Sequence, residues 1–88
     1  MTEEQVRDRV RAFIVMNFLF GDESEAPADA QSLLESGILD STGVLELVDF
    51  LEDELNTVVA DTETVPANLD SIARLTSFVM NKRASLVA

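Results

Sequence analysis

Residues 37–55 read GILDSTGVLELVDFLEDEL, in which a short apolar run, residues 37–39, precedes a strongly amphipathic segment. From position 44 onward, the apolar side chains recur at the spacing of one helix face: Val44, Leu47, Val48, Leu51 and Leu55. The carboxylates of the segment fall outside this row. The pattern predicts a helix over about residues 41–55 that buries one face and leaves an acidic face in solvent.

Two other segments carry helical patterns. Thr2 and Gln5 have the spacing of a capping box, and the apolar residues behind them predict a helix over about 3–19. Apolar residues at positions 72, 75, 78 and 79 predict a last helix over about 71–83, after a brief helix near 65–69 that begins around Pro66. No alternating strand pattern competes with these helices. We therefore expect an all-α bundle of three main helices plus one short helix.

A long connection, residues 20–40, separates the first two predicted helices. Gly21, Pro27 and Asp29 argue against regular structure in its first half. A loop of this length is uncommon in a compact domain unless it is anchored or functional. We expect a short helical turn around residues 30–34 and four apolar anchors in the core: Leu33, Leu34, Ile38 and Leu39.

The composition indicates one folded domain. The chain has 88 residues, and 47% of them are hydrophobic, which is too many for a disordered acidic tail. It has no cysteine, which excludes a disulfide framework and a thiolate metal site. We expect neither a signal peptide nor a membrane span, because the sequence shows no basic-then-apolar opening and no apolar run near the roughly 20 residues of a span. We expect a single cytoplasmic domain over residues 1–88, monomeric, ordered over about 3–83 and frayed at the C-terminus.

The charge is strongly negative and unevenly distributed. The formal net charge is −11, and no Lys or Arg occurs between Arg11 and Arg74. Any surface built from the middle of the chain is therefore uniformly acidic. Such a field repels nucleic acid and anionic lipid and attracts proteins with basic patches. We expect no nucleic-acid partner, and we interpret the acidity as a partner-recognition surface or, more simply, as an aid to solubility.

Asp40-Ser41 is the pair most able to carry chemistry. It places a hydroxyl at the start of the central predicted helix, in a chain without His, Cys, Tyr or Trp. Unpaired N–H groups and a partial positive charge at a helix start stabilise an attached phosphate. The alternative is that Asp and Ser are ordinary helix caps. The chain contains a comparison, because Asp70-Ser71 begins the last helix without an acidic face and is predicted to act as a cap only.

Further along the same predicted helix, one apolar residue lies outside the core row. Leu45 is one turn from Ser41 and one turn from Asp49, so it shares their side of the helix. A leucine among acids beside a modification site is a plausible partner contact. The residues that we expect on this face are Leu45, Glu46, Asp49, Glu52 and Asp53.

The stretch Gly-Ile-Leu-Asp-Ser-Thr-Gly-Val-Leu-Glu-Leu-Val, residues 37–48, resembles the attachment motif of acyl carrier proteins. Length, acidity and predicted helix layout are similar over nearly the whole chain. The resemblance implies that a phosphopantetheinyl transferase moves 4′-phosphopantetheine from coenzyme A onto Ser41, with Asp40 as the flanking residue that the transferase recognises. The thiol of the arm then holds an acyl or aminoacyl group as a thioester. Thr42 and the acidic face would contact the transferase, loading ligases or synthetases, and downstream transferases with basic patches.

Three positions depart from the carriers of fatty acid synthesis, which usually show Leu and Asp after the serine where this chain has Thr42 and Gly43, and often an apolar residue where it has Asp49. The Gly-Ile-Leu-Asp sequence before the serine is more similar to that of stand-alone carriers that serve aminoacyl or other specialised ligases. An enzyme is disfavoured, because a nucleophilic serine needs a base and the chain has no His. No calcium-binding loop pattern occurs, and we expect no metal site. The rival interpretation is an acidic helical interaction module without a prosthetic group.

Overall fold

A computed structural model describes the backbone of residues 1–87 and the side chains of residues 1–84. The chain is a small all-α bundle with α1 (Glu3–Phe18), α2 (Ser41–Glu54), the short α3 (Pro66–Leu69) and α4 (Ile72–Val87). Two 3-10 turns, η1 (Glu23–Glu25) and η2 (Asp61–Glu63), lie in the connections. The predicted three main helices and one short helix are confirmed, and no strand occurs in the described part of the chain.

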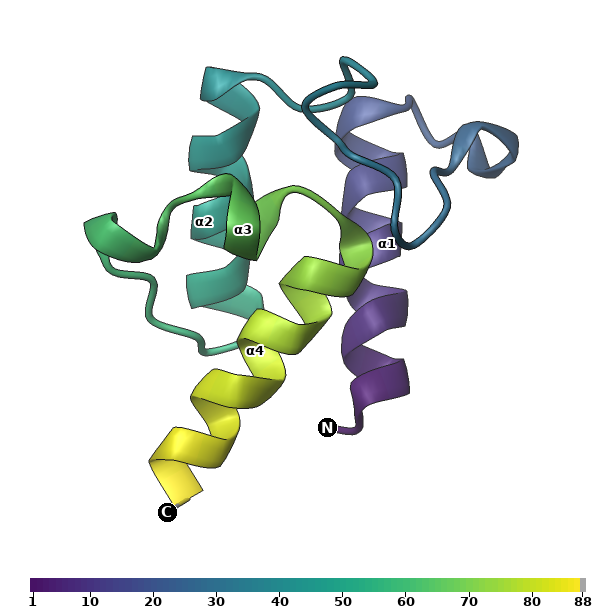
Figure 1. The fold of residues 1–88 in the computed structure, drawn as a ribbon. Helices are drawn as coiled ribbons and strands as arrows, with labels where there is room; N and C mark the ends of the chain where they lie inside the picture. Colours follow the sequence, from purple (N-terminus) through teal and green to yellow (C-terminus); the bar gives the residue numbers. More distant parts are fainter. Residues whose placement is uncertain (88) are drawn as a thin grey trace.

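Figure 1 shows α1 and α2 running in opposite directions, with α4 crossing them and α3 lying in front of α2. The loop between α1 and α2 covers the end of the bundle at which α2 begins. Both chain ends lie toward the opposite end. The start of α2 therefore lies close to the loop, to α3 and to the end of α1.

The core is built from the apolar faces that the sequence predicts. From α1, Val6, Val10 and Ile14 are fully buried, and from α2, Leu47 and Leu51 are fully buried. Burial of a leucine or isoleucine side chain contributes about 1.5–3 kcal/mol, so these rows hold the helices together. The other members of the core cluster come from the loop, the end of α2 and its following segment, α3 and α4: Leu33, Leu39, Leu55, Val59, Leu69, Ile72, Leu75, Phe78 and Val79.

The capping box of α1 is present as predicted. The Gln5 N–H donates to the Thr2 hydroxyl oxygen at 3.2 Å, and the Thr2 N–H donates to the Gln5 Oε1 at 2.8 Å. Both bonds satisfy donors that the first turn leaves unpaired. Farther along the helix, Arg7 and Arg11 form ion pairs with Asp29, which tie the long loop to α1.

The loop differs from the expectation in two respects. The helical turn predicted around residues 30–34 lies about two residues later, where the Ser36 N–H donates to the Ser32 carbonyl oxygen, whereas the N–H groups of residues 33 and 34 bond to Asp70. Leu33 and Leu39 are buried anchors and Ile38 packs at the edge of the core, but Leu34 is exposed. Gly37 adopts φ +79°, a left-handed conformation that glycine reaches without strain, where the loop turns toward α2.

The last helix is longer than predicted. α4 runs to Val87, because residues 84–87 contain no glycine or proline that would end it. Of the predicted frayed tail, Ala88 lies outside the described residues. Within α4, Lys82 forms an ion pair with Glu63 of η2 at 2.6 Å, and this hydrogen bond lowers the pKa of the Glu63 carboxyl.

Candidate functional site

The start of α2 leaves the Ser41 hydroxyl free. Asp40 is the N-cap residue: its backbone is extended, and its Oδ1 accepts a hydrogen bond from the Gly43 N–H at 2.7 Å. Ser41 is the first residue of the helix, and its side chain is exposed. It makes no side-chain hydrogen bond to any of residues 1–84. The predicted position of the serine at the helix start is correct, and the capping task falls to its neighbour.

The second Asp-Ser pair is used in the opposite way. The Ser71 hydroxyl oxygen accepts a hydrogen bond from the Arg74 N–H at 3.1 Å, which caps the start of α4, and Ser71 is buried. Asp70 turns to the long loop instead. It accepts hydrogen bonds from the Ser32 hydroxyl at 2.7 Å and from the Leu34 N–H at 2.9 Å. The two pairs therefore differ in the property that a modifying enzyme requires, which is access to the hydroxyl.

Asp70 is held as a carboxylate by these partners. The Ser32 hydrogen bond and then the Leu34 hydrogen bond lower the pKa of the Asp70 carboxyl below its ordinary value of 3.8. Asp70 also accepts the Leu33 N–H through its backbone oxygen at 2.7 Å. One residue thus fixes the part of the loop that leads to Ser41. The predicted cap-only role of the Asp70-Ser71 pair is wrong for Asp70 and correct for Ser71.

Close packing explains the glycine at position 43, and the sequence did not reveal this. It is buried, and a Cβ atom at this position would lie 3.1 Å from Leu39 Cδ1 and 3.1 Å from Phe18 Cε1. A side chain would push apart the anchor of the loop and the end of α1. The glycine therefore lets the loop and α1 pack closely against the first turn of α2.

An apolar pocket of about 210 Å³ opens beside Ser41. It lies between the start of α2, the long loop and α3, and it explains the exposure of Leu34 and Val65, which line it. Sequence reasoning missed this pocket because its walls come from three separated segments. In the sequence, the pocket was indicated only by apolar residues that belong to no predicted apolar helix face. The full lining is Leu34, Leu39, Ser41, Val44, Thr64, Val65, Pro66, Leu69 and Asp70.

The acidic face of α2 lies in solvent as predicted. Leu45 is 66% exposed, which confirms that it lies outside the core row. The other predicted contact residues are also exposed: Thr42, Glu46, Asp49, Glu52 and Asp53. One of them has an internal partner, since a carboxylate oxygen of Glu52 accepts a hydrogen bond from the Val59 N–H at 3.2 Å. Among residues 1–84, no ion pair joins this face to a Lys or Arg.

Among the described residues, no side chain forms a hydrogen bond with the Ser41 hydroxyl. A serine nucleophile needs a neighbouring base, and the nearest carboxylate in sequence, Asp40, uses Oδ1 for the helix cap. Within the described residues, no three acidic side chains converge in a way that could hold a metal ion. The arrangement therefore offers an accessible hydroxyl at a positive helix end, beside an apolar pocket and an acidic face.

Comparison with known proteins does not assign the chain to a family. Neither the protein-family models nor the curated proteins give a match to this sequence. Among the described helices, none is both long enough and apolar enough to cross a membrane.

Proposed function

We propose that the chain is an acyl carrier protein that bears 4′-phosphopantetheine on the Ser41 hydroxyl. The observation that carries the proposal is the accessibility of this hydroxyl at the first residue of α2, with the cap supplied by Asp40. An anion on the first residue of a helix is stabilised by the free N–H groups and the dipole of that end. The attached phosphate would meet these conditions without any rearrangement of the helix.

The prosthetic group supplies what the chain itself lacks. The sequence has no cysteine, and the arm ends in the thiol that carries an acyl or aminoacyl group as a thioester. The chain has no His, so proton removal from Ser41 is left to the phosphopantetheinyl transferase. This division of labour makes the protein a substrate of the transferase and a carrier, rather than an enzyme.

The pocket beside Ser41 supports the proposal. Its walls are mainly apolar, and Ser41 itself is one of its lining residues. An arm attached there begins at the pocket entrance, next to Val44 of α2 and Val65 before α3. Apolar surface at this position favours contact with an apolar arm or cargo over free extension into water.

The exposed acidic face supplies the recognition surface. Leu45, Glu46 and Asp49 follow Ser41 along α2 and lie in solvent. Basic patches on the transferase, on a loading ligase or synthetase and on downstream transferases would meet this face with complementary charge, which speeds encounter and fixes orientation. The Thr42-Gly43 sequence favours a carrier of a specialised acyl or aminoacyl pathway over one of fatty acid synthesis.

Intact-mass spectrometry tests the proposal against a bare interaction module. The chain and its Ser41→Ala variant are each incubated with coenzyme A, magnesium and a broad-specificity transferase. The carrier gains one phosphopantetheine group, and Ser41→Ala gains none. No mass change in either chain contradicts the proposal and favours the module. Ser71→Ala serves as the matched control, because its hydroxyl is buried and its loss should leave the mass gain intact.

A further inference from the structure

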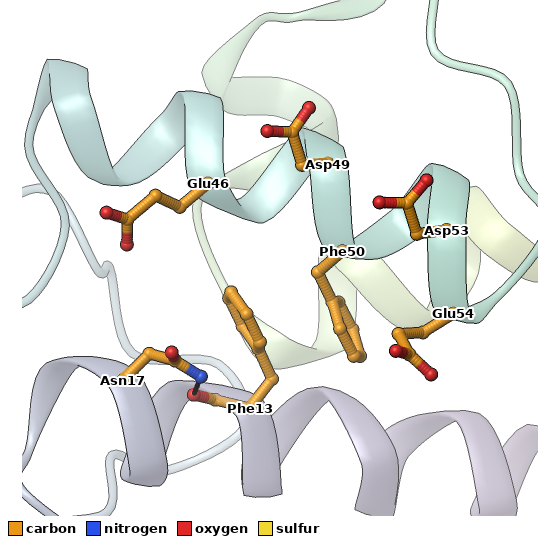
Figure 2. Close-up of a pocket in the computed structure, with 7 residues that line it drawn as sticks. All are labelled: Phe13, Asn17, Glu46, Asp49, Phe50, Asp53 and Glu54. Carbon is orange, nitrogen blue, oxygen red and sulfur yellow. Dashed lines mark hydrogen bonds between the residues drawn. The ribbon is translucent and has the colours of Figure 1, made fainter.

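A second hollow, between α1 and α2, differs in character from the pocket at Ser41. Its volume is about 370 Å³, and Figure 2 shows phenyl rings from both helices meeting in it. The surrounding side chains are mostly acidic. The lining residues are Phe13, Asn17, Glu46, Asp49, Phe50, Asp53 and Glu54, and we call this hollow the α1–α2 groove.

The apolar floor of the groove is an aromatic pair. The rings of Phe13 and Phe50 stack with centroids 4.3 Å apart and planes 19° apart. Phe18 meets Phe13 edge-on at 5.7 Å, which supports the pair from the side of α1. Stacking covers one face of each ring, and because Phe13 and Phe50 are only partly buried, the opposite faces and the ring edges are the parts that the groove can present. Ring faces carry negative potential and attract flat cations.

The rim of the groove is lined by carboxylates at helical spacing around Phe50. Glu46 and Glu54 stand one turn before and one turn after it, and Figure 2 shows both reaching toward α1 on either side of the rings. Asp49 and Asp53 lie along the upper edge of α2 in the same view. All four are exposed. Glu46 and Glu54 therefore flank the aromatic pair, whereas Asp49 and Asp53 point away from the rings and add negative charge along the edge of α2.

No cation of the chain fills this site among residues 1–84. None of the lining residues is a Lys or Arg, and in the described part of the chain no ion pair joins a Lys or Arg to the four carboxylates. Arg9, one turn before Phe13 on α1, lines a separate hollow near the start of that helix. Asn17 donates its side-chain N–H to the Phe13 carbonyl oxygen at 2.9 Å, which leaves its amide oxygen as a further acceptor. The groove therefore combines apolar rings with hydrogen-bond acceptors and no donor group bearing positive charge.

We propose that the α1–α2 groove binds an arginine side chain from a basic segment of a partner protein. A guanidinium is flat, always charged and weakly hydrated, so it stacks on rings while its N–H donors reach carboxylates. A lysine ammonium matches the charge, but it is compact and strongly hydrated and gains less from contact with a ring face. The charge of the rim repels anionic occupants such as nucleic acid. The inference rests on the partner-recognition part of the proposed function and not on attachment at Ser41.

Titration of the isotope-labelled full chain with a short peptide, followed by amide resonances, tests the inference. The probe is acetyl-Gly-Arg-Ala-Ala-Arg-Gly-amide, and matched peptides carry lysine or neutral citrulline in place of arginine. We expect saturable shifts centred on residues 13, 17, 46 and 50. The lysine peptide should bind at least about threefold more weakly, and the citrulline peptide should not bind measurably.

Variants separate the groove from general acidity. Glu46→Gln with Glu54→Gln should weaken arginine-peptide binding by about fivefold or more. Glu23→Gln with Glu25→Gln removes the same charge from exposed η1 residues and should change binding by less than about twofold. Phe50→Leu keeps apolar volume but removes the ring, and it should also weaken binding. If Phe50→Leu alters the helical circular dichroism spectrum, the exposed glutamate pair decides the outcome.

Other results would overturn the proposal. Equal losses in the two glutamine pairs, or shifts spread over every acidic segment, would mean that the peptide senses net charge alone. Unchanged binding by a folded Phe50→Leu variant would remove the role of the rings. A concentration-dependent dimer that involves the groove would make a second copy of the chain its occupant. Ser41→Ala should bind the peptide like the parent chain. Peptide binding therefore tests the groove separately from the attachment of phosphopantetheine.

Discussion

The Asp40 carboxylate accepts a hydrogen bond from the Gly43 backbone N–H, with 2.7 Å between Oδ1 and N. This bond satisfies an unpaired donor of α2, so the helix does not need the hydroxyl of the next residue, Ser41. The two adjacent side chains divide two tasks, because the carboxylate stabilises the helix and the hydroxyl remains in solvent. In the second pair the order is reversed, and Ser71 is the cap.

Substitutions at this pair should separate the two tasks. Asp40→Ala should lower the free energy of unfolding by about 1 kcal/mol, because the helix loses its cap. Asp40→Asn should retain most of that stability, since the amide oxygen can accept the same bond. Ser41→Ala should change it by less than about 0.5 kcal/mol. Urea denaturation measures all three. A loss at Ser41→Ala equal to that at Asp40→Ala would show that the hydroxyl is structural.

Leucines on opposite faces of α2 should respond differently to truncation. Leu47→Ala and Leu51→Ala should each cost about 2–5 kcal/mol, because both side chains are fully buried and leave a cavity. Leu45→Ala should cost well under about 1 kcal/mol, because that side chain is 66% exposed. Thermal and urea denaturation provide the measurement. Comparable losses at all three positions would place Leu45 in the core and exclude it as a partner contact.

The Asp70 carboxylate gives stability a defined dependence on pH. Its hydrogen bonds from Ser32 and Leu34 lower its pKa in the folded state, so folding favours the charged form. The resulting stabilisation is fully present above the ordinary value of 3.8 and is lost as the pH falls from there through the lowered pKa. Asp70→Asn should therefore destabilise the chain at pH 7, and the difference from the parent should shrink below about pH 4.

Urea denaturation of both chains at neutral and acidic pH measures this difference. Asp49→Asn is the matched control, because Asp49 is exposed and accepts no hydrogen bond from residues 1–84. It should stay within about 0.5 kcal/mol of the parent at both pH values. A difference for Asp70→Asn that persists unchanged at acidic pH would mean that its carboxylate charge does not stabilise the loop.

Charge reversal on the acidic face should affect recognition without affecting folding. Glu46→Lys and Asp49→Lys should each slow modification by the transferase by about three- to tenfold, since surface charges chiefly control encounter rates. Glu25→Lys makes the same change in η1 and should have a smaller effect. The initial rate of phosphopantetheine addition measures the effect, and circular dichroism monitors the fold. Loss of helicity in either α2 variant would show that the residue is structural.

The helices were predictable because their signals are local. The row from Val44 to Leu55, the capping box at Thr2 and the proline at position 66 each specify structure through neighbours within a turn or two of helix. The exposure of Leu45 followed from the same periodicity. The predicted ends of α1 and α2 agree with the observed ends to within one residue. In contrast, α4 continues past Arg83, because no helix-breaking residue follows it.

The features that the sequence concealed depend on contacts between distant segments. Asp70 reaches a loop almost forty positions earlier in the chain, which no capping rule anticipates. Phe18 and Leu39 approach Gly43 closely, which leaves little room for a side chain at this position. The stack of Phe13 on Phe50 likewise joins two helices across the long loop. The spacing of apolar residues shows which face of a helix is buried, but it does not show which residues of two helices are in contact.

The attachment site itself is tested most directly by fragment mass spectrometry of the chain after treatment with coenzyme A, magnesium and a phosphopantetheinyl transferase. The account predicts a single phosphopantetheine group, located by fragment ions on Ser41. A chain that stays unmodified with every transferase offered, or a group located on a different serine, would contradict it.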